Sequence, residues 1–321
     1  MDSTRHSDSI NVTPATLAVV QVLQHTRGAA YITFCALTVA AWDWTLALGE
    51  EVRMVKRCGR SHAVLAYFLA RTSVVIGCIS ALVFFIKVPP DEKWCLVLFN
   101  WMGVVYTTGS AAKAYLFLLR VRAIHDNSKL VTLFSSAGWL VMVCARMTIA
   151  FTIDASAGRC AVTEMGSLSA FSLWLNLAYD TCIFLSVSVR LASHTKLTGT
   201  PWIASFVRGY GLPPTMRHLL HDGQIYYSIT ILFTLLAAVV AVSPVHPIYQ
   251  GIFSIPAFTI ETLMTCKIFR AMILRSLHPI QDDNLPMAPA EARTTAISIF
   301  ELDTVLELRI RTTSTGREQV E

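Results

Sequence analysis

Charged residues are scarce in this chain of 321 residues. Asp, Glu, Lys and Arg together make up 15% of the sequence, hydrophobic residues make up 54%, and the mean hydropathy is +0.54. A soluble domain carries about 25% charged residues and roughly 45–50% apolar ones. The deficit of charge therefore excludes an ordinary soluble protein and indicates an integral membrane protein whose main partner is the lipid bilayer. The formal net charge of +5 reflects membrane topology, and no nucleic-acid partner is expected.

The sequence also lacks the common signatures of catalysis. It contains no G-x-S-x-G elbow and no P-loop. None of the 9 histidines falls within an expected membrane span, which excludes an intramembrane zinc site of His and Asp ligands. A retinal Schiff base would need a lysine near the middle of the seventh span, whereas Lys267 lies at its end. We therefore expect no enzyme activity, no cofactor and no metal.

Seven apolar runs are long enough to cross a hydrocarbon core of ~30 Å, which takes about 20 helical residues. Runs of this length predict helices, because the strands of a membrane barrel would be ~10-residue alternating segments. The sequence predicts an all-α, seven-transmembrane-helix bundle. Its spans are expected at about 29–48, 63–88, 94–119, 130–153, 168–189, 225–242 and 248–269. Pro256 in the seventh span predicts a kink.

The transmembrane domain, residues 29–269, lies between two polar flanks. Residues 1–28 are expected outside the membrane or in the lumen, and their short apolar stretch is too short to span. This segment does not have the pattern of a cleavable signal peptide. Asn11 in Asn-Val-Thr is a candidate N-glycosylation site. Residues 270–321 are expected to form a partly disordered cytoplasmic tail.

Basic residues are distributed unequally between the two sides of the membrane. Of the 26 Lys and Arg residues, 18 fall on one side, 5 on the other and 3 within spans. Loops rich in Lys and Arg remain in the cytoplasm, so the N-terminus is predicted outside and the C-terminus in the cytoplasm. The plasma membrane is the expected location, with another endomembrane as the alternative.

Two cysteines face the oxidising side in this topology. Cys95 opens the third span, and Cys160 lies in the outer loop between the fourth and fifth spans. A disulfide between them would tie this loop to the mouth of the bundle. Two free thiols are the alternative.

Four charged residues, two acids and two bases, lie in one layer of the expected bundle. They are Asp43, Arg71, Lys113 and Glu261, roughly 8 to 12 Å from the cytoplasmic end of their spans. A charge inside a span costs on the order of 2.5–3.5 kcal/mol, so it normally has a partner. We predict a neutral network made of an Asp43–Arg71 pair and a Lys113–Glu261 pair. The network is either purely structural or a lock that breaks on activation.

A second polar set lies in the fourth and fifth spans. Arg146 is expected in the outer half of the fourth, whereas Asn176 and Asp180 share one face of the fifth because they are four residues apart. These residues are candidates for the lining of a ligand cavity. The tryptophans that could line the same cavity are Trp101, Trp139 and Trp174. Membrane interfaces favour tryptophan, so roles in an aromatic belt or in packing are the alternative.

The first two spans and the third-span exit contain several short motifs: Trp42-Asp43, Glu51-Val52, the basic loop that follows, Arg71, and the LLRVRAIH run at 118–125. These motifs give the chain a resemblance to a family of fungal membrane proteins. It covers roughly residues 30–130, with Trp42 where the family usually has tyrosine and Ala70 where it tends to have asparagine. The family consists mostly of basidiomycete seven-span proteins classified as a domain of unknown function. The resemblance thus implies a seven-span architecture and no specific activity.

Two classes of function remain. Seven spans, an outer N-terminus and the candidate disulfide resemble G-protein-coupled receptors, with a small-molecule or peptide ligand outside. Arg120 and Arg122, at the end of the third span, are then candidates for coupling to a heterotrimeric G protein. However, no Asp-Arg-Tyr follows the third span and no Asn-Pro-x-x-Tyr lies in the seventh. The alternative is a transporter, channel-like or membrane-organising protein that uses the buried charges as a relay, although no internal repeat of the transporter kind is evident. The receptor-like interpretation is favoured.

Overall fold

The computed structural model of the chain describes residues 14–58, 61–86, 92–124, 129–152, 167–195, 214–245 and 247–277. These residues are almost entirely helical and contain no strand, which confirms the predicted all-α class. Seven of the described helices are long and apolar enough to cross a membrane. The chain is therefore an integral membrane protein by length and composition of its helices.

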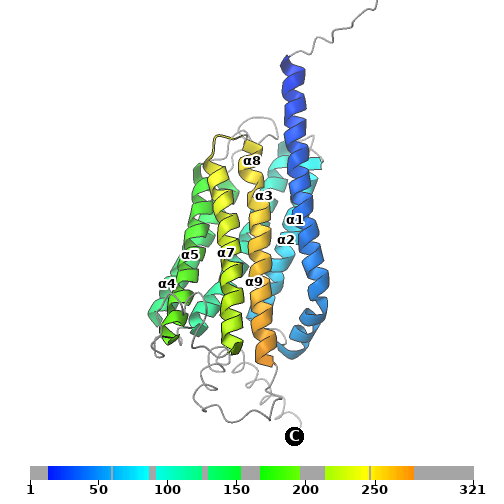
Figure 1. The fold of residues 1–321 in the computed structure, drawn as a ribbon. Coiled ribbons are helices and arrows are strands. Elements are labelled where there is room, and N and C mark those ends of the chain that lie inside the picture. The colour runs from blue at the N-terminus through cyan, green and yellow to red at the C-terminus, as the bar shows by residue number, and fades with distance from the viewer. Residues whose placement is uncertain are drawn as a thin grey trace, which may run out of the picture.

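The helices stand side by side in one elongated bundle (Figure 1). They are α1 Pro14–Cys58, α2 His62–Ile86, α3 Glu92–Ile124, α4 Lys129–Thr152, α5 Ser167–Thr195, α7 Pro214–Val242, α8 Pro247–Ile252 and α9 Ser254–Leu277. The lower end of the bundle in Figure 1 holds the end of α1, the start of α2 and the end of α9. The upper end holds the N-terminal part of α1 and the short helix α8.

Contacts between neighbouring helices close a ring in the order α1, α2, α3, α4, α5, α7 and α9, with α9 returning to α1. Helices α3 and α9 have contacts beyond their ring neighbours: α3 also touches α5 and α9, and α9 also touches α2. Of the seven candidate spans, α9 has the largest buried share. Charged side chains on α3 and α9 can therefore be surrounded by protein.

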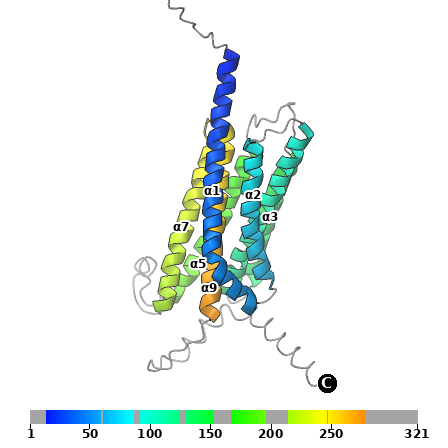
Figure 2. The same ribbon diagram turned by 90° about the vertical axis from the view of Figure 1, so that its right-hand side faces the viewer.

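Helix α1 is much longer than a membrane span. Its 45 residues extend about 68 Å, more than twice the ~30 Å hydrocarbon core. The first turns rise above the other helices, and the last turns bend toward the start of α2 (Figure 2). The short apolar stretch near the N-terminus is thus part of this continuous helix.

His25 lies on α1 within the first candidate span, and His62 is the first residue of the second, so the expectation that every histidine falls outside the spans is wrong for these two residues. Nδ1 of His25 is 3.1 Å from the hydroxyl of Tyr249 on α8, and the two rings meet edge to face. His25 falls inside the span because α1 is longer than its apolar run. The contact fastens α1 to α8 at the upper end of the bundle.

The seventh span is divided into α8 and α9 by a turn at Phe253. Pro256 has no N–H to donate to the carbonyl of Ile252, and its ring would collide with that carbonyl in a continuous helix. Ser254 instead donates its hydroxyl to the carbonyl of Gly251 at 2.6 Å. The kink predicted from Pro256 therefore takes the form of a break directly before the first turn of α9.

A glycine permits the close approach of three helices in the centre of the bundle. A Cβ atom on Gly109 of α3 would lie 2.0 Å from Oγ of Ser73 on α2 and 2.7 Å from Cζ of Phe258 on α9. The Ser73 hydroxyl could rotate away, but the Cβ of Ser73, at 2.8 Å, could not move without a shift of α2. Gly109 therefore sets the distance at which α3 packs against α2 and α9.

Apolar side chains cover the outside of the ring. Leu130 and Phe134 on α4 are each 80% exposed, and Trp42 on α1 is 67% exposed. Exposed apolar surface on this scale would drive association in water, but lipid tails are as apolar as leucine. The outer surface therefore suits a bilayer.

Candidate functional site: two buried charge clusters

The buried ion pairs of the described bundle fall into two clusters that share no residue. The Arg71 cluster consists of Asp43, Glu51, Tyr67 and Arg71, from α1 and α2. The Lys113 cluster consists of Lys113, Asn176, Asp180 and Glu261, from α3, α5 and α9. The structure thus brings together both expected pairs, Asp43 with Arg71 and Lys113 with Glu261. It does so at two sites, whereas the sequence suggested a single network of four residues.

In the Arg71 cluster, one guanidinium holds two carboxylates of α1. Arg71 donates from Nη2 to Oδ2 of Asp43 at 2.6 Å and from Nη1 to Oε1 of Glu51 at 2.5 Å. The Arg71 side chain is 2% exposed, and the two carboxylates are 9% and 5% exposed. Such charge-assisted bonds are the strong ones when buried. Arg71 therefore fastens the last turns of α1 onto α2.

Two aromatic side chains complete the coordination of Glu51. Tyr67, one turn before Arg71 on α2, donates its hydroxyl to Oε1 at 2.7 Å, and Trp44 donates its indole N–H to Oε2 at 3.2 Å. Arg71 Nη1 also donates to the Tyr67 hydroxyl at 2.6 Å. The guanidinium lies 5.8 Å from the ring centroids of both Trp44 and Tyr67, within cation–π range. Both oxygens of this buried carboxylate are thus satisfied.

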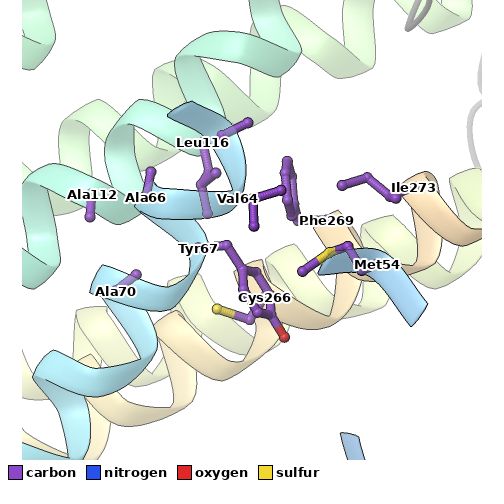
Figure 3. Packing of buried hydrophobic residues seen from close by; sticks show 11 residues of the cluster. Met54, Val64, Ala66, Tyr67, Ala70, Ala112, Leu116, Cys266, Phe269 and Ile273 are labelled. Carbon is purple, nitrogen blue, oxygen red and sulfur yellow. The ribbon is translucent and has the colours of Figure 1, made fainter. Parts of the chain in front are cut away.

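An apolar cluster lies against Tyr67 next to the charged residues. Figure 3 shows the ring of Tyr67 beside Phe269 and Cys266 of α9, with Met54 of α1 close by. The rings of Tyr67 and Phe269 are stacked with centroids 5.8 Å apart. This packing excludes water from the neighbourhood of the guanidinium. A low dielectric strengthens the ion pairs and raises the cost of losing one partner.

Helix α9 adds two further cations at the edge of the Arg71 cluster. Lys267 Nζ is 3.4 Å from Oδ1 of Asp43, and Arg270 donates from Nε to Glu50 at 2.6 Å. Arg270 Nη1 is also 3.4 Å from the Tyr67 hydroxyl. The Lys267 side chain is 41% exposed, so its pairing is weaker than that of Arg71. Because Glu261 lies on the same helix, α9 touches both clusters.

The Lys113 cluster joins three helices that are distant in sequence. Lys113 Nζ of α3 forms an ion pair with Oε1 of Glu261 on α9, and it lies 3.4 Å from Oδ2 of Asp180 on α5. Asn176, one turn before Asp180, donates from Nδ2 to Glu261 at 3.2 Å and to Asp180 at 3.4 Å. The Lys113 side chain is 0% exposed. One ammonium group thus faces two carboxylates inside the membrane-spanning region.

The structure places two of the expected cavity residues, Asn176 and Asp180, in the Lys113 cluster, with Arg146 near enough to act on Asp180 electrostatically. Asn176 and Asp180 do share a face of α5, but this face points at α3 and α9 and joins Lys113. Arg146 on α4 makes no ion pair with either of them among those of the described residues, and its buried Nε has no hydrogen-bond partner there. Asp180 and Lys113 lie at the same depth in the bundle, which cannot be seen when residues are counted along each span separately.

The three tryptophans do not line a common cavity either. Trp101 is 52% exposed and Trp174 is 42% exposed, so both lie on the outer surface of the bundle. Trp139 is partly buried, and its indole N–H donates to the carbonyl of Ala111 on α3 at 3.0 Å. The three tryptophans therefore pack within the bundle or lie on its outer surface, which matches the alternative that the sequence left open.

Arg120 is turned into the bundle. It is 4% exposed, and its Nη1 donates to the hydroxyl of Tyr227 on α7 at 3.2 Å. Tyr227 in turn packs against Phe117 and Phe184. Arg120 therefore links α3 to α7, and its charge is not displayed on the lower surface as a coupling residue would require. Arg122 is half-buried near the end of α3.

Two predicted sites on the outer side involve residues outside the described part of the chain. Cys95 lies in the first turns of α3 and is not among the free cysteines, whereas its expected partner Cys160 falls outside the described ranges. Asn11 also falls outside them. The disulfide and the glycosylation site therefore stay predictions.

Among the described residues, no group of three or more His, Cys, Asp or Glu side chains is arranged to hold a metal ion. In the Lys113 cluster, the ammonium group stands between the two carboxylates. A divalent cation would be repelled from that position. The chemistry available at these sites is therefore ion pairing and proton exchange.

The segment that carries the Arg71 cluster has relatives. Residues 31–76 match a family of unknown function, DUF6533. No curated protein and no solved structure matches the chain. The DUF6533 segment begins in α1 and ends in α2, and it contains all four members of the Arg71 cluster. The match therefore coincides with a structural unit, two helices fastened by one arginine.

Two members of the Arg71 cluster were not anticipated from the sequence. Glu51 lies beyond the span expected at 29–48, because the first apolar run ends near Leu48, yet α1 continues to Cys58. Tyr67 lies inside the span expected at 63–88, where hydropathy does not distinguish it from its apolar neighbours. The signal was present within the DUF6533 segment: Tyr67 precedes Arg71 by four residues, a spacing that places both on one helix face.

Proposed function

We propose that the chain is a receptor-like signalling protein. The observation that supports this proposal is a ring of helices held by two buried ionic clusters, one between α1 and α2 and one joining α3, α5 and α9. A buried ion pair between helices is either made or broken, so each cluster can act as an element with two discrete arrangements. A ligand that favours one arrangement would shift the population of the bundle. No enzyme activity or cofactor belongs to this proposal.

The orientation and the location belong to the same proposal. The N-terminus faces the outside and the lower end of the bundle faces the cytoplasm, in line with the distribution of Lys and Arg. A small-molecule or peptide ligand would then approach from the upper end, where α1 and α8 meet. The membrane proposed is the plasma membrane of a fungal cell, since the sequence resembles fungal seven-span proteins.

Labelling of single introduced cysteines tests the orientation. Gln24 and Arg53 are exposed residues near opposite ends of α1. A membrane-impermeant maleimide should label Gln24→Cys on intact cells and Arg53→Cys only after permeabilisation. The unmodified chain is the blank: Cys58 near Arg53 is half-buried, and burial raises the pKa of its thiol, so it reacts slowly. The opposite labelling pattern would show that the N-terminus faces the cytoplasm, which contradicts the proposed orientation.

Co-purification tests the signalling role. Detergent-solubilised protein should retain a heterotrimeric G-protein α subunit from the membranes in which it is expressed. A non-hydrolysable GTP analogue should release that subunit, because nucleotide exchange separates a receptor from its G protein. An Arg71→Lys variant, which is expected to keep the fold without binding both carboxylates through separate nitrogens, is the control for a bundle with a disturbed cluster. If no G protein is retained and reconstituted protein carries a substrate across proteoliposomes, the receptor proposal is wrong.

A second candidate function is proton-coupled transport. The observation that favours it is the sharing of Lys113 by Asp180 and Glu261 within the spans. Intramembrane groups of acids and bases are typical of proton relays in pumps and transporters. In that case, proteoliposomes with an imposed pH gradient should accumulate a solute, and Lys113→Met should abolish the accumulation.

A further inference from the structure

Among the ion pairs of the described bundle, the Lys113 cluster contains two carboxylates, Asp180 and Glu261, and one cation that forms ion pairs with them, Lys113. The side chains of Glu261 and Asp180 are 3% and 8% exposed. Two ionised carboxylates on one ammonium group would leave a net negative charge in a water-poor interior. Such a charge is normally removed by a counter-ion or by a proton.

Two atoms of this cluster point to the missing component. Oδ1 of Asn176 and Oδ1 of Asp180 are both buried and have no hydrogen-bond partner in the described part of the chain. Asn176 is 1% exposed, and its amide nitrogen already donates to both carboxylates, so its side chain is aimed into the cluster. A buried polar atom without a partner costs ~1–3 kcal/mol. The two orphaned atoms lie on side chains one helical turn apart.

The two atoms cannot satisfy each other while Asp180 is ionised. An amide oxygen and a carboxylate oxygen both only accept hydrogen bonds. A proton on Oδ1 of Asp180 changes that oxygen into a donor, and Oδ1 of Asn176 becomes its acceptor, directly or through one bound water. The same proton removes the surplus negative charge. One event therefore corrects both the hydrogen bonding and the charge.

We propose that the Lys113 cluster is a proton-binding site in which Oδ1 of Asp180 carries the proton. Water supplies the proton and receives it again, so the exchange forms and breaks a single O–H bond. Glu261 stays ionised because it holds the direct ion pair with Lys113 and also accepts from Asn176. Loss of the proton from Asp180 would place a second full charge beside Lys113. The ammonium group would then be drawn away from Glu261, which alters the contact between α3 and α9.

The charged and titratable groups on the surrounding helices are engaged elsewhere or make no ion pair with Asp180. Arg71 of α2 is held by Asp43 and Glu51, and Tyr227 of α7 is bonded by Arg120. The remaining groups are Tyr179, which precedes Asp180 on α5, and Arg146 of α4, which acts on both carboxylates electrostatically. Arg146 forms no ion pair with either among the described contacts. Among the described residues, Arg146 is therefore the cation that could neutralise Asp180 in place of a proton.

Infrared spectroscopy of the full chain in lipid nanodiscs tests the site without any ligand. A protonated carboxylic acid in an apolar interior gives a carbonyl stretch that a carboxylate lacks, and the band moves to lower frequency in heavy water. We expect this band in the wild type at neutral pH and its loss at alkaline pH. Asp180→Asn should abolish it. Asp43→Asn, which changes an aspartate held by Arg71 and Lys267, should leave it unchanged.

A measurement on the wild-type protein keeps the test decisive even if Asp180→Asn does not fold. Protein grown with aspartate carrying heavy carbon at its side-chain carboxyl should show the same band at lower frequency. The inference is overturned if the folded wild type has no such band at neutral pH, since Arg146 would then be neutralising Asp180. It is also overturned if the band does not respond to labelled aspartate but disappears in Glu261→Gln. None of these results depends on whether the chain is a receptor or a transporter.

Discussion

Replacing Arg71 with methionine should lower the free energy of unfolding by about 3–5 kcal/mol, because it leaves Asp43 and Glu51 buried without their cation. The expected result is a large loss of folded protein in detergent and of protein at the cell surface. The effect is measured by thermal unfolding of the purified variant, followed by tryptophan fluorescence or by the reactivity of buried Cys266.

Two variants serve as controls for this result. Arg71→Lys keeps the positive charge but cannot bind two carboxylates through separate nitrogens, so it should lose part of the stability and retain the fold. Asp43→Asn with Arg71→Met should recover little, because Glu51 remains buried and unpaired. A double variant as stable as the wild type would show that Glu51 has no part in the cluster.

Replacing Lys113 with methionine should be at least as damaging, because the side chain is fully buried and faces two carboxylates from different helices. We expect a loss of about 3–5 kcal/mol, the range for an ion pair broken in a protein interior. Thermal unfolding of the variant in the same detergent measures it. Leu116→Met, a volume-conserving substitution at an uncharged buried position of α3, controls for the methionine side chain itself.

The rescue of Lys113→Met depends on which carboxylate is ionised. If Asp180 carries a proton, adding Glu261→Gln alone removes the remaining uncompensated charge and should restore most of the stability. Adding Asp180→Asn alone should restore little. The reverse order of rescue would place the charge on Asp180 and contradict the proton-binding site.

The fold could be predicted from the sequence because it depends on hydropathy, which is a property of runs of residues. Seven apolar runs gave seven helices, and Pro256 marked the break between α8 and α9. The ends of α1 could not be predicted in the same way. Its helix continues past the apolar run to Cys58 because Glu51 and Met54 are buried against α2 and α9, and that burial is a tertiary property.

The partners of the buried charges were only partly predictable. Asp43 with Arg71, and Lys113 with Glu261, follow from the rule that a charge inside a span needs an opposite charge at similar depth. That rule does not give the rotation of each helix about its axis. The rotation of α5 toward α3 is set by packing, so the sequence could not show that Asp180 meets Lys113. For the same reason it could not show that Arg120 points into the bundle toward Tyr227.

Helix α9 is the element through which the two clusters can influence each other. It supplies Glu261 to one cluster and Lys267 and Arg270 to the edge of the other. Glu261 and Lys267 are six residues apart, about 9 Å along a rigid helix. A displacement of α9 that breaks the pair with Lys113 would also change the contacts made to Asp43 and Glu50. This shared helix is the physical basis of the proposed switch.

The stability of a neutralised Arg71 cluster shows whether Arg71 is balanced by the two carboxylates of α1, Asp43 and Glu51. The triple variant Asp43→Asn, Glu51→Gln and Arg71→Met removes every charge of that cluster while keeping similar volumes. Replacing a buried ionic group as a set is often neutral or stabilising, whereas removing one partner is not. We predict that thermal unfolding of the triple variant returns close to the wild-type temperature, well above that of Arg71→Met alone. A triple variant as unstable as Arg71→Met alone would mean that Arg71 is not balanced by Asp43 and Glu51.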